Sequence, residues 1–148
     1  MNQLIPTYRG SVQVWHCDHM GHMNVMWYVG KFDEATWNLL AMMGITGAYM
    51  RDNKRCMVAV DQRVQYKREL LAGDTLTIAS GVTQMGQKSL QFFHEMRKAE
   101  SGEIAATVRF TGVQIDAETR KAVPFDEALR LRSRQFLRDY DFGERLAA

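Results

Sequence analysis

The sequence predicts an α+β domain in which an antiparallel sheet wraps around one long central helix, with a further helix near the C-terminus. Apolar residues recur at three- and four-residue steps between residues 24 and 44, and the next sixty residues read as strands joined by short turns. Such a switch from helical to strand period is typical of α+β domains. Because 148 residues is the length of one ordinary domain, we expect residues 1–148 to form a single unit.

The first half of the chain is predicted to hold one strand and the long helix. Alternation of Val12 and Val14 predicts a strand over residues 11–15, and a loop over residues 16–23 follows it. Asn24 is a good N-cap and Gly44 a good residue to end the helix, which would be about 20 residues or about 30 Å long. Its buried stripe is expected to comprise Val25, Tyr28, Val29, Phe32, Ala35, Thr36, Leu39, Leu40 and Met43.

The second half is predicted to hold about four strands and the closing helix. After a short irregular or helical piece at residues 45–54, residues 57–70 alternate, which places Val58, Val60, Val64 and Tyr66 on one face and Asp61, Arg63 and Lys67 on the other. Turn signals at residues 72–74, 85–87 and 100–102 separate strands expected at 75–84, 89–97 and 104–115, and such short turns indicate antiparallel pairing. Residues 126–137 predict an amphipathic helix capped by Asp126.

Composition excludes several classes of protein. With 46% apolar and 24% charged residues the chain has an ordinary globular composition, and a net charge of +2 gives no reason to expect a nucleic-acid partner. Residues 1–10 do not resemble a signal peptide, and the longest apolar stretch, residues 39–50, is too short to span a membrane. We therefore expect a cytoplasmic protein without a membrane partner, with Cys17 and Cys56 as free thiols.

The segment of residues 16–24 concentrates the chemistry, because it holds three of the four histidines together with Asp18. It directly precedes the long helix, whose first N–H groups lack intrahelical partners and carry partial positive charge. A carboxylate at Asp18 could therefore face a carbonyl group whose oxygen is held by amides near Asn24 to Met26, with Gly21 allowing a close backbone approach.

The run Asp18-His19-Met20-Gly21-His22-Met23-Asn24, followed by Tyr28, resembles the signature of hotdog-fold acyl-CoA thioesterases of the broad 4-hydroxybenzoyl-CoA thioesterase family. The resemblance extends over about residues 11–124. It implies a hotdog domain that hydrolyses an acyl-CoA to free acid and CoA, with Asp18 as general base or nucleophile and the backbone amide at Val25 polarising the thioester carbonyl. His22 and Asn24 are implied as supporting residues. CoA is then part of the substrate, and no separate cofactor is expected.

Binding partners follow from the same reading. Arg63, Lys67, Arg68 and Lys88 could meet the phosphates of CoA, although a solvated sheet face would look the same. A sheet that packs one helix leaves its other face and its edges uncovered, so we expect a homodimer or a tetramer.

Other interpretations remain open. Asp18 could simply cap a turn, and the domain could be a non-catalytic module that binds acyl-CoA without cleaving it. Cys17 and the histidines near Asp18 include every common zinc ligand type, but their spacing fits no closed four-ligand motif, so we expect no metal. A hotdog hydratase or dehydratase is conceivable by fold alone. His94 is expected to be a satisfied strand histidine, and Glu34 to be either solvated or in support of a neighbouring subunit's site.

Overall fold

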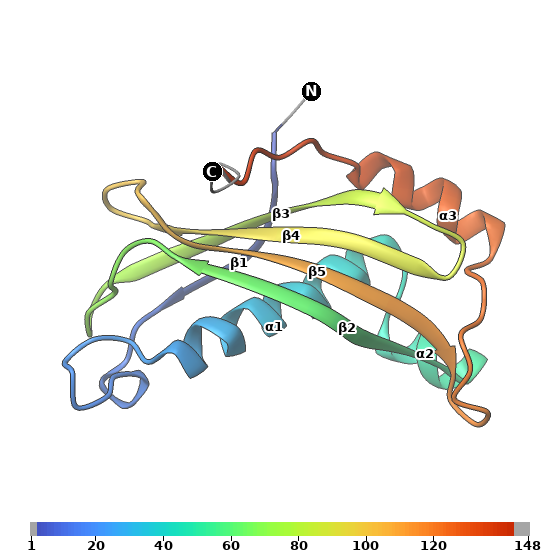
Figure 1. Ribbon diagram of the computed structural model, residues 1–148, viewed down its shortest axis with the longest axis horizontal. Coiled ribbons are helices and arrows are strands. Elements are labelled where there is room, and N and C mark those ends of the chain that lie inside the picture. Colours follow the sequence, from blue (N-terminus) through green and yellow to red (C-terminus); the bar gives the residue numbers. More distant parts are fainter. Residues whose placement is uncertain (1–2, 144–148) are drawn as a thin grey trace, which may run out of the picture.

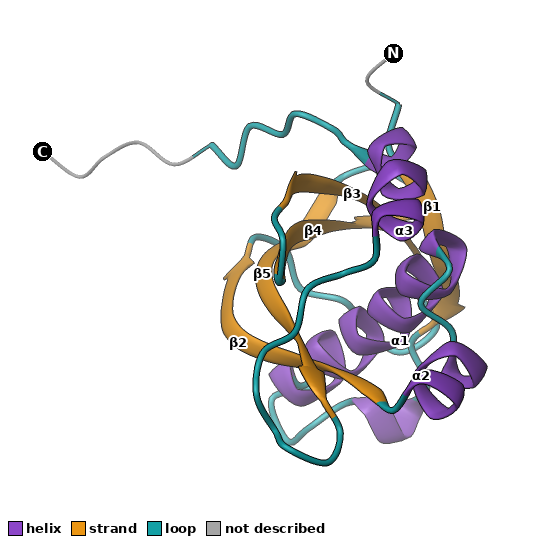
Figure 2. Ribbon diagram, turned by 90° about the vertical axis from the view of Figure 1, so that its right-hand side faces the viewer, coloured by secondary structure: helices purple, strands orange, loops and turns teal. Residues whose placement is uncertain are grey.

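A curved five-stranded sheet and a long helix that lies against one of its faces form the architecture of the computed structural model, which describes residues 3–143 (Figure 1). The strands are β1 (Ile5–Ser11), β2 (Arg55–Tyr66), β3 (Thr75–Met85), β4 (Ser89–Lys98) and β5 (Ile104–Asp116). Their order is β1-β3-β4-β5-β2, and every neighbouring pair is antiparallel. The helices α1 (Val25–Met43), α2 (Gly47–Asn53) and α3 (Glu127–Ser133) lie on one side of the sheet (Figure 2). The predicted α+β fold is confirmed.

Both ends of α1 are capped as the sequence predicts. The side chain of Asn24 accepts a hydrogen bond from the Met26 N–H, and Gly44 has a φ of 100°, the left-handed conformation that favours glycine. The buried side of α1 contains most of the predicted stripe, namely Tyr28, Phe32, Ala35, Thr36, Leu39, Leu40 and Met43. Two predicted members are not buried: Val29 is half-buried, and Val25 is 56% exposed, because it stands in the first turn beyond the edge of the core.

The first strand lies earlier in the chain than predicted. Of the predicted strand at residues 11–15 only Ser11 is in a strand, at the end of β1: Val14–His16 is a short 3-10 helix, and Val14 is exposed while Val12 is buried. The true strand β1 contains Pro6 and Gly10, which weaken any apolar alternation. It is an edge strand, where a proline is tolerated because its missing N–H faces no neighbour.

A β-bulge in β2 overturns the predicted division of its side chains. Ala59 pairs with Gly112 and Asp61 with Thr111, so Val60 has no partner and bulges from the edge. Such an insertion exchanges the two faces of a strand beyond it. Met57 before the bulge and Val64 after it both pack against the core, so the prediction that Val58, Val60, Val64 and Tyr66 share one face is wrong.

The last described segment covers part of the sheet's outer face, opposite α1. It follows α3, which is capped by Asp126 as predicted, and a 3-10 turn at Arg134–Phe136. Leu137 bridges to Val82, and the Tyr140 ring stacks on the fully buried Phe93 with ring centroids 4.3 Å apart. The sequence did not predict this contact.

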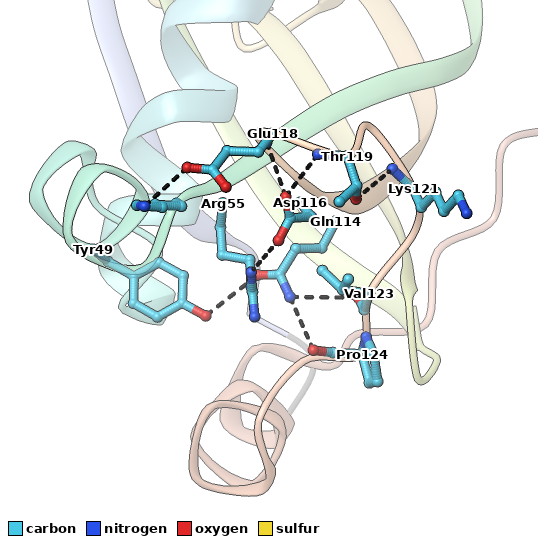
Figure 3. Close-up of polar contacts among 10 residues, drawn as sticks. Tyr49, Arg55, Gln114, Asp116, Glu118, Thr119, Lys121, Val123 and Pro124 are labelled. Carbon is cyan, nitrogen blue, oxygen red and sulfur yellow. Dashed lines mark hydrogen bonds and ion pairs between the residues drawn. The ribbon is translucent and has the colours of Figure 1, made fainter.

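A network of hydrogen bonds and ion pairs joins neighbouring elements at the end of the sheet where β2 begins and β5 ends (Figure 3). Gln114 of β5 is fully buried; its side-chain amide donates to the Pro124 carbonyl at 3.0 Å and accepts from the Tyr49 hydroxyl at 3.3 Å. Arg55 Nη1 lies 3.2 Å from Asp116 Oδ2. These bonds connect α2, β2, β5 and the loop that leads to α3.

Two predictions concern the whole chain. None of the helices within residues 3–143 has the length and apolarity needed to cross a membrane. The single domain predicted for residues 1–148 stays a prediction, and residues 1, 2 and 144–148 lie outside the described residues.

Candidate active site

The loop before α1 is closed on itself by backbone contacts. The Asp18 N–H donates to the His22 carbonyl at 3.2 Å, and the Gly21 N–H donates to the Asp18 carbonyl at 3.0 Å. Gly21 has a φ of 87°, which a residue with a side chain rarely adopts. The Met23 N–H donates to the Leu70 carbonyl at 2.7 Å, which ties the loop to the segment after β2. The glycine is therefore required by the turn that presents Asp18.

The carboxylate of Asp18 accepts one hydrogen bond on each oxygen. Asn24 Nδ2 donates to Oδ2 at 2.7 Å and the Met20 N–H donates to Oδ1 at 2.9 Å. The bond from Asn24, followed by the bond from Met20, lowers the pKa of Asp18 below its ordinary value. Each oxygen keeps a free lone pair, so this ionised group can still accept a proton from water or attack a carbonyl carbon.

Asn24 joins this carboxylate to the start of α1. While its Nδ2 donates to Asp18, its Oδ1 accepts from the Met26 N–H at 2.9 Å, and both contacts together fix the orientation of the amide. The Trp27 N–H donates to the Asn24 carbonyl at 2.9 Å. The Val25 N–H, in contrast, meets no acceptor among the described residues, although it stands at the positive end of the helix. One donor is thus left available next to the Asp18–Asn24 pair.

A groove of about 240 Å³ begins beside this donor. His22, Val25, Tyr28, Tyr66, Lys67 and Arg68 are among its lining residues. Burial raises the pKa of Tyr28 to about 12, so its hydroxyl stays protonated and donates to the Arg68 carbonyl at 2.8 Å. The wall of the groove is therefore mainly apolar, with two cationic side chains at its rim.

His22 points to a residue that sequence reasoning missed. Its Nε2 lies 3.5 Å from Glu69 Oε1, across the same groove. Glu69 and Tyr66 come from the end of β2 and the segment after it, which the sequence alone does not place next to the Asp18 loop. Neither the charge of Glu69 nor the aromatic ring of Tyr66 indicates from the sequence that the residue lies at this groove.

The four predicted CoA-binding cations do not lie together within a single copy of the protein. Lys67 and Arg68 line the groove, and Arg68 also pairs with Glu103 at 3.0 Å. Arg63 lines a separate depression on the outer face of the sheet, next to Asp61 and Arg109. Lys88 lies in the β3–β4 turn, at the opposite end of the sheet and roughly 30 Å along the strands from the Asp18 end.

His94 and His16 have structural partners. His94 is fully buried between the side chains of Thr36 and Ser80, which confirms the prediction of a satisfied strand histidine, and burial lowers its pKa to about 3. His16 is buried against Trp27, with ring centroids 4.5 Å apart. Burial and the charge of Lys31 lower the pKa of His16.

Lys31 is another residue that the sequence did not single out. It is 4% exposed in the middle of α1, and its Nζ donates to the Tyr8 hydroxyl at 3.2 Å and the Ser11 carbonyl at 3.3 Å. Burial lowers its pKa. Within residues 3–143, no three His, Cys, Asp or Glu side chains come close enough to hold a metal ion.

Comparison with known proteins gives one family. The model of the thioesterase-like superfamily matches residues 12–132. The chain is 28% identical to the long-chain acyl-CoA thioesterase FadM of Escherichia coli, over 86% of this chain and 96% of that protein. It is 26% identical to the L-carnitine dehydrogenase/betainyl-CoA thioesterase of Rhizobium meliloti, over 72% of this chain but only 21% of that longer protein.

A solved structure gives the same fold. The Staphylococcus aureus hypothetical protein SAV2348, determined in complex with CoA, has a TM-score of 0.87 and 20% identity; the match covers 100% of this chain and 97% of that one. At this identity the likeness concerns the fold, which is the predicted hotdog architecture. These matches reach the superfamily level, and the narrower 4-hydroxybenzoyl-CoA thioesterase family stays a prediction.

Proposed function

The chain belongs to the thioesterase-like superfamily and is a thioesterase, and from this premise we propose that it hydrolyses acyl-CoA to a free acid and CoA at the Asp18 loop. The observation that carries the proposal is the pairing of two groups with opposite tasks. An ionised carboxylate on Asp18 stands beside an N–H on Val25 that has no acceptor among the described residues. Thioester hydrolysis needs such a pair: a group that delivers or activates the nucleophile and a donor that stabilises the oxyanion.

The Val25 N–H acts on the carbonyl oxygen of the thioester. As the tetrahedral intermediate forms, the negative charge on this oxygen grows, and a donor held at a helix N-terminus stabilises it without rearrangement. Because the backbone performs this task, an exposed valine side chain at the position is acceptable. Removing one such donor elsewhere costs about 100- to 1000-fold in rate, which sets the scale of its contribution.

Asp18 supplies the nucleophile in one of two ways. As general base it takes a proton from water, whose oxygen then bonds to the carbonyl carbon while the C–S bond breaks and the thiolate leaves as CoA. As nucleophile its own oxygen bonds to the carbonyl carbon, the C–S bond breaks and the CoA thiolate leaves, and water then hydrolyses the mixed anhydride to the free acid and the Asp18 carboxylate. Asn24 holds the carboxylate in place in both cases, and His22 across from Glu69 supports water at the groove.

The CoA phosphates are proposed to meet Lys67 and Arg68 at the rim of the groove. Arg63 and Lys88 are also proposed phosphate contacts, but their positions on the outer face and at the far end of the sheet require a site built with a second copy of the chain. No separate cofactor is proposed, and a cytoplasmic location remains a prediction.

Assembly into a homodimer or tetramer is proposed on related grounds. Strand β2 lies at the edge of the sheet, and two large side chains on it are exposed, Val60 at 60% and Tyr66 at 48%. An unpaired edge of this kind is a template for pairing with another chain. Light scattering after size-exclusion chromatography tests this, and a stable monomer at micromolar concentration would contradict it.

A panel of acyl-CoA substrates tests the proposed function. We expect thiol release from at least one member of a set that spans short, medium and long straight chains, 4-hydroxybenzoyl-CoA and an acyl group ending in trimethylammonium. Turnover of none, together with tight acyl-CoA binding by calorimetry, would instead establish the non-catalytic binding module. Turnover abolished by a chelator and restored by zinc would establish a metal-dependent hydrolase.

A further inference from the structure

A second recess lies between α1 and the sheet, apart from the groove next to Asp18. It has a volume of about 110 Å³, and its lining includes Asp33, Trp37 and Leu40 from α1, Met57 from β2, and Phe110 and Gly112 from β5. Apart from Asp33 and Thr36, the lining side chains are apolar or aromatic. The recess therefore favours an apolar ligand over a polar one.

The recess reaches the interior of the domain. Leu40 and Phe110 belong to the core and are 2% and 7% exposed, and Phe110 is stacked on Phe92 with ring centroids 4.9 Å apart. The recess is open at its floor because Gly112 lacks a side chain: a Cβ there would come 3.4 Å from Met57 Cε and 3.7 Å from Phe92 Cε1. One glycine therefore controls its depth.

The recess lies on the same side of α1 as the proposed oxyanion donor. Val25, Val29, Thr36 and Leu40 follow one another at steps close to whole helical turns, so they share a face, and Thr36 and Leu40 line the recess. From Val25 to Thr36 is about 17 Å along the axis at the rise of an α-helix. A straight saturated chain advances about 1.3 Å per carbon from its bond lengths, so about 12 to 14 carbons span this distance.

We propose that the chain of the acyl group runs along this face of α1 and places its end in the Gly112 recess, so that the substrate class is straight-chain acyl-CoA of about 12 to 14 carbons. This inference depends on the proposed function, because it measures length from the Val25 N–H. A short aryl acyl group held at Val25 does not reach the recess. Asp33 at its rim, bonded by Trp37 Nε1 at 3.2 Å, also opposes a chain that ends in a carboxylate.

Two substitutions at the recess are expected to shift chain-length preference in opposite directions. Gly112→Val fills the floor and should lower kcat/KM at least tenfold for dodecanoyl-CoA while leaving butyryl-CoA within twofold. Trp37→Ala widens the recess and should move the optimum toward longer chains. Loss of fold cannot produce this opposite pair, because it would lower all substrates together. Gly112→Ala, whose Cβ has ordinary contacts, gives a milder shift if the valine variant does not fold.

A control variant enlarges a side chain at another position of the sheet by two methyl groups. Ala79→Val on β3 faces away from α1, beside Glu95, and should leave the chain-length profile of the wild type unchanged. The profile is a ratio within each protein, so it does not depend on total activity. Calorimetry with the same acyl-CoAs on the Asp18→Ala variant gives a second readout that requires no turnover.

The outcomes separate the two proposals. If some acyl-CoA is turned over and the wild type, Gly112→Ala and Trp37→Ala share one chain-length profile, the proposal that the recess holds the acyl chain is overturned. The proposed thioesterase function would stay in place. Preference for the aryl or the trimethylammonium substrate would do the same. Absence of turnover with all substrates would overturn the proposed function. In that case, acyl-CoA binding that still strengthens up to about 12 carbons, and is lost in Gly112→Ala, would retain the recess as a chain-binding site.

Discussion

The two ends of the sheet use polar groups in opposite ways. At the end shown in Figure 3, Gln114, Asp116 and Arg55 have their hydrogen-bonding groups engaged by neighbouring side chains and backbone. At the other end Asp18 keeps lone pairs free, the Val25 N–H meets no acceptor among the described residues, and Trp15 and Met20 are 69% and 67% exposed. The unused bonding capacity beside a groove is what leads us to propose the Asp18 end, and not the richer polar cluster, as the place of the reaction.

His94 is a buried polar group whose hydrogen-bonding atoms are engaged, like those of the polar network in Figure 3. Its protonation should give the largest effect on stability. Its pKa is lowered to about 3, so between pH 6.5 and 4.5 the unfolded chain binds a proton that the folded chain does not. The free energy of unfolding should fall by about 1.4 kcal/mol per pH unit as pH decreases in this range. Urea unfolding at several pH values measures the slope.

Two variants assign that slope to its source. His94→Gln should flatten it, whereas His19→Gln, which changes an exposed loop histidine, should leave it intact. An unchanged slope in His94→Gln would mean that His94 is not held neutral in the core.

Loss of the Gln114 side chain tests the polar network at the end of the sheet shown in Figure 3. Gln114→Ala leaves the half-buried Tyr49 hydroxyl and the Pro124 carbonyl without this partner, and should cost about 2 to 3 kcal/mol of stability. Because the proposed reaction takes place at the Asp18 loop, at the other end of the sheet, kcat measured below the melting temperature should stay within threefold of the wild type. Gln91→Ala, at an exposed position on β4, serves as the control and should change stability by less than about 0.5 kcal/mol. A large loss of kcat in Gln114→Ala would show that the two ends are not separate in function.

Asn24 belongs to both the helix cap and the site, and two variants separate these roles. Asn24→Ala removes the cap and should cost about 1 kcal/mol of stability. It also removes the main cause of the lowered pKa of Asp18, so the acid limb of the kcat/KM profile should move to higher pH. Asn24→Ser keeps a capping oxygen but lacks the amide donor, and should move the acid limb with little loss of stability. Identical pH profiles in all three proteins would refute the contact's role.

His22 should have the smallest effect. Its partner Glu69 is 71% exposed and 3.5 Å away, so His22→Gln should change stability by less than about 0.5 kcal/mol. As a supporting residue for water, it should reduce kcat less than tenfold. A loss of 100-fold or more would make His22 a catalytic residue in its own right.

The sequence predicted α1 almost to the residue because its period, N-cap and final glycine all agree. It missed β1, since an edge strand with Pro6 and Gly10 depends on backbone pairing with β3 more than on its own pattern. The bulge at Val60 could not be read either, because one unpaired residue leaves no local signature.

Within the site, the order of residues along the chain predicted the contact between Asp18 and the start of α1. It did not predict Glu69 and Tyr66, which reach the groove only because β2 ends beside that helix. Nor could it show that Lys88 lies at the other end of the sheet, since that depends on where a hairpin folds back. Contacts local in sequence were accessible, and those set by strand register were not.

Replacement of Asp18 by asparagine is the most direct test of the central claim. Asparagine has the size of aspartate and keeps an oxygen that can accept the bonds from Asn24 or Met20, so the free energy of unfolding should stay within about 1 kcal/mol of the wild type. With the best acyl-CoA of the panel, kcat should fall at least about 100-fold, because the variant can neither take a proton from water nor form an anhydride. A folded Asp18→Asn protein that keeps kcat within a few-fold of the wild type would contradict the assignment of the reaction to this carboxylate.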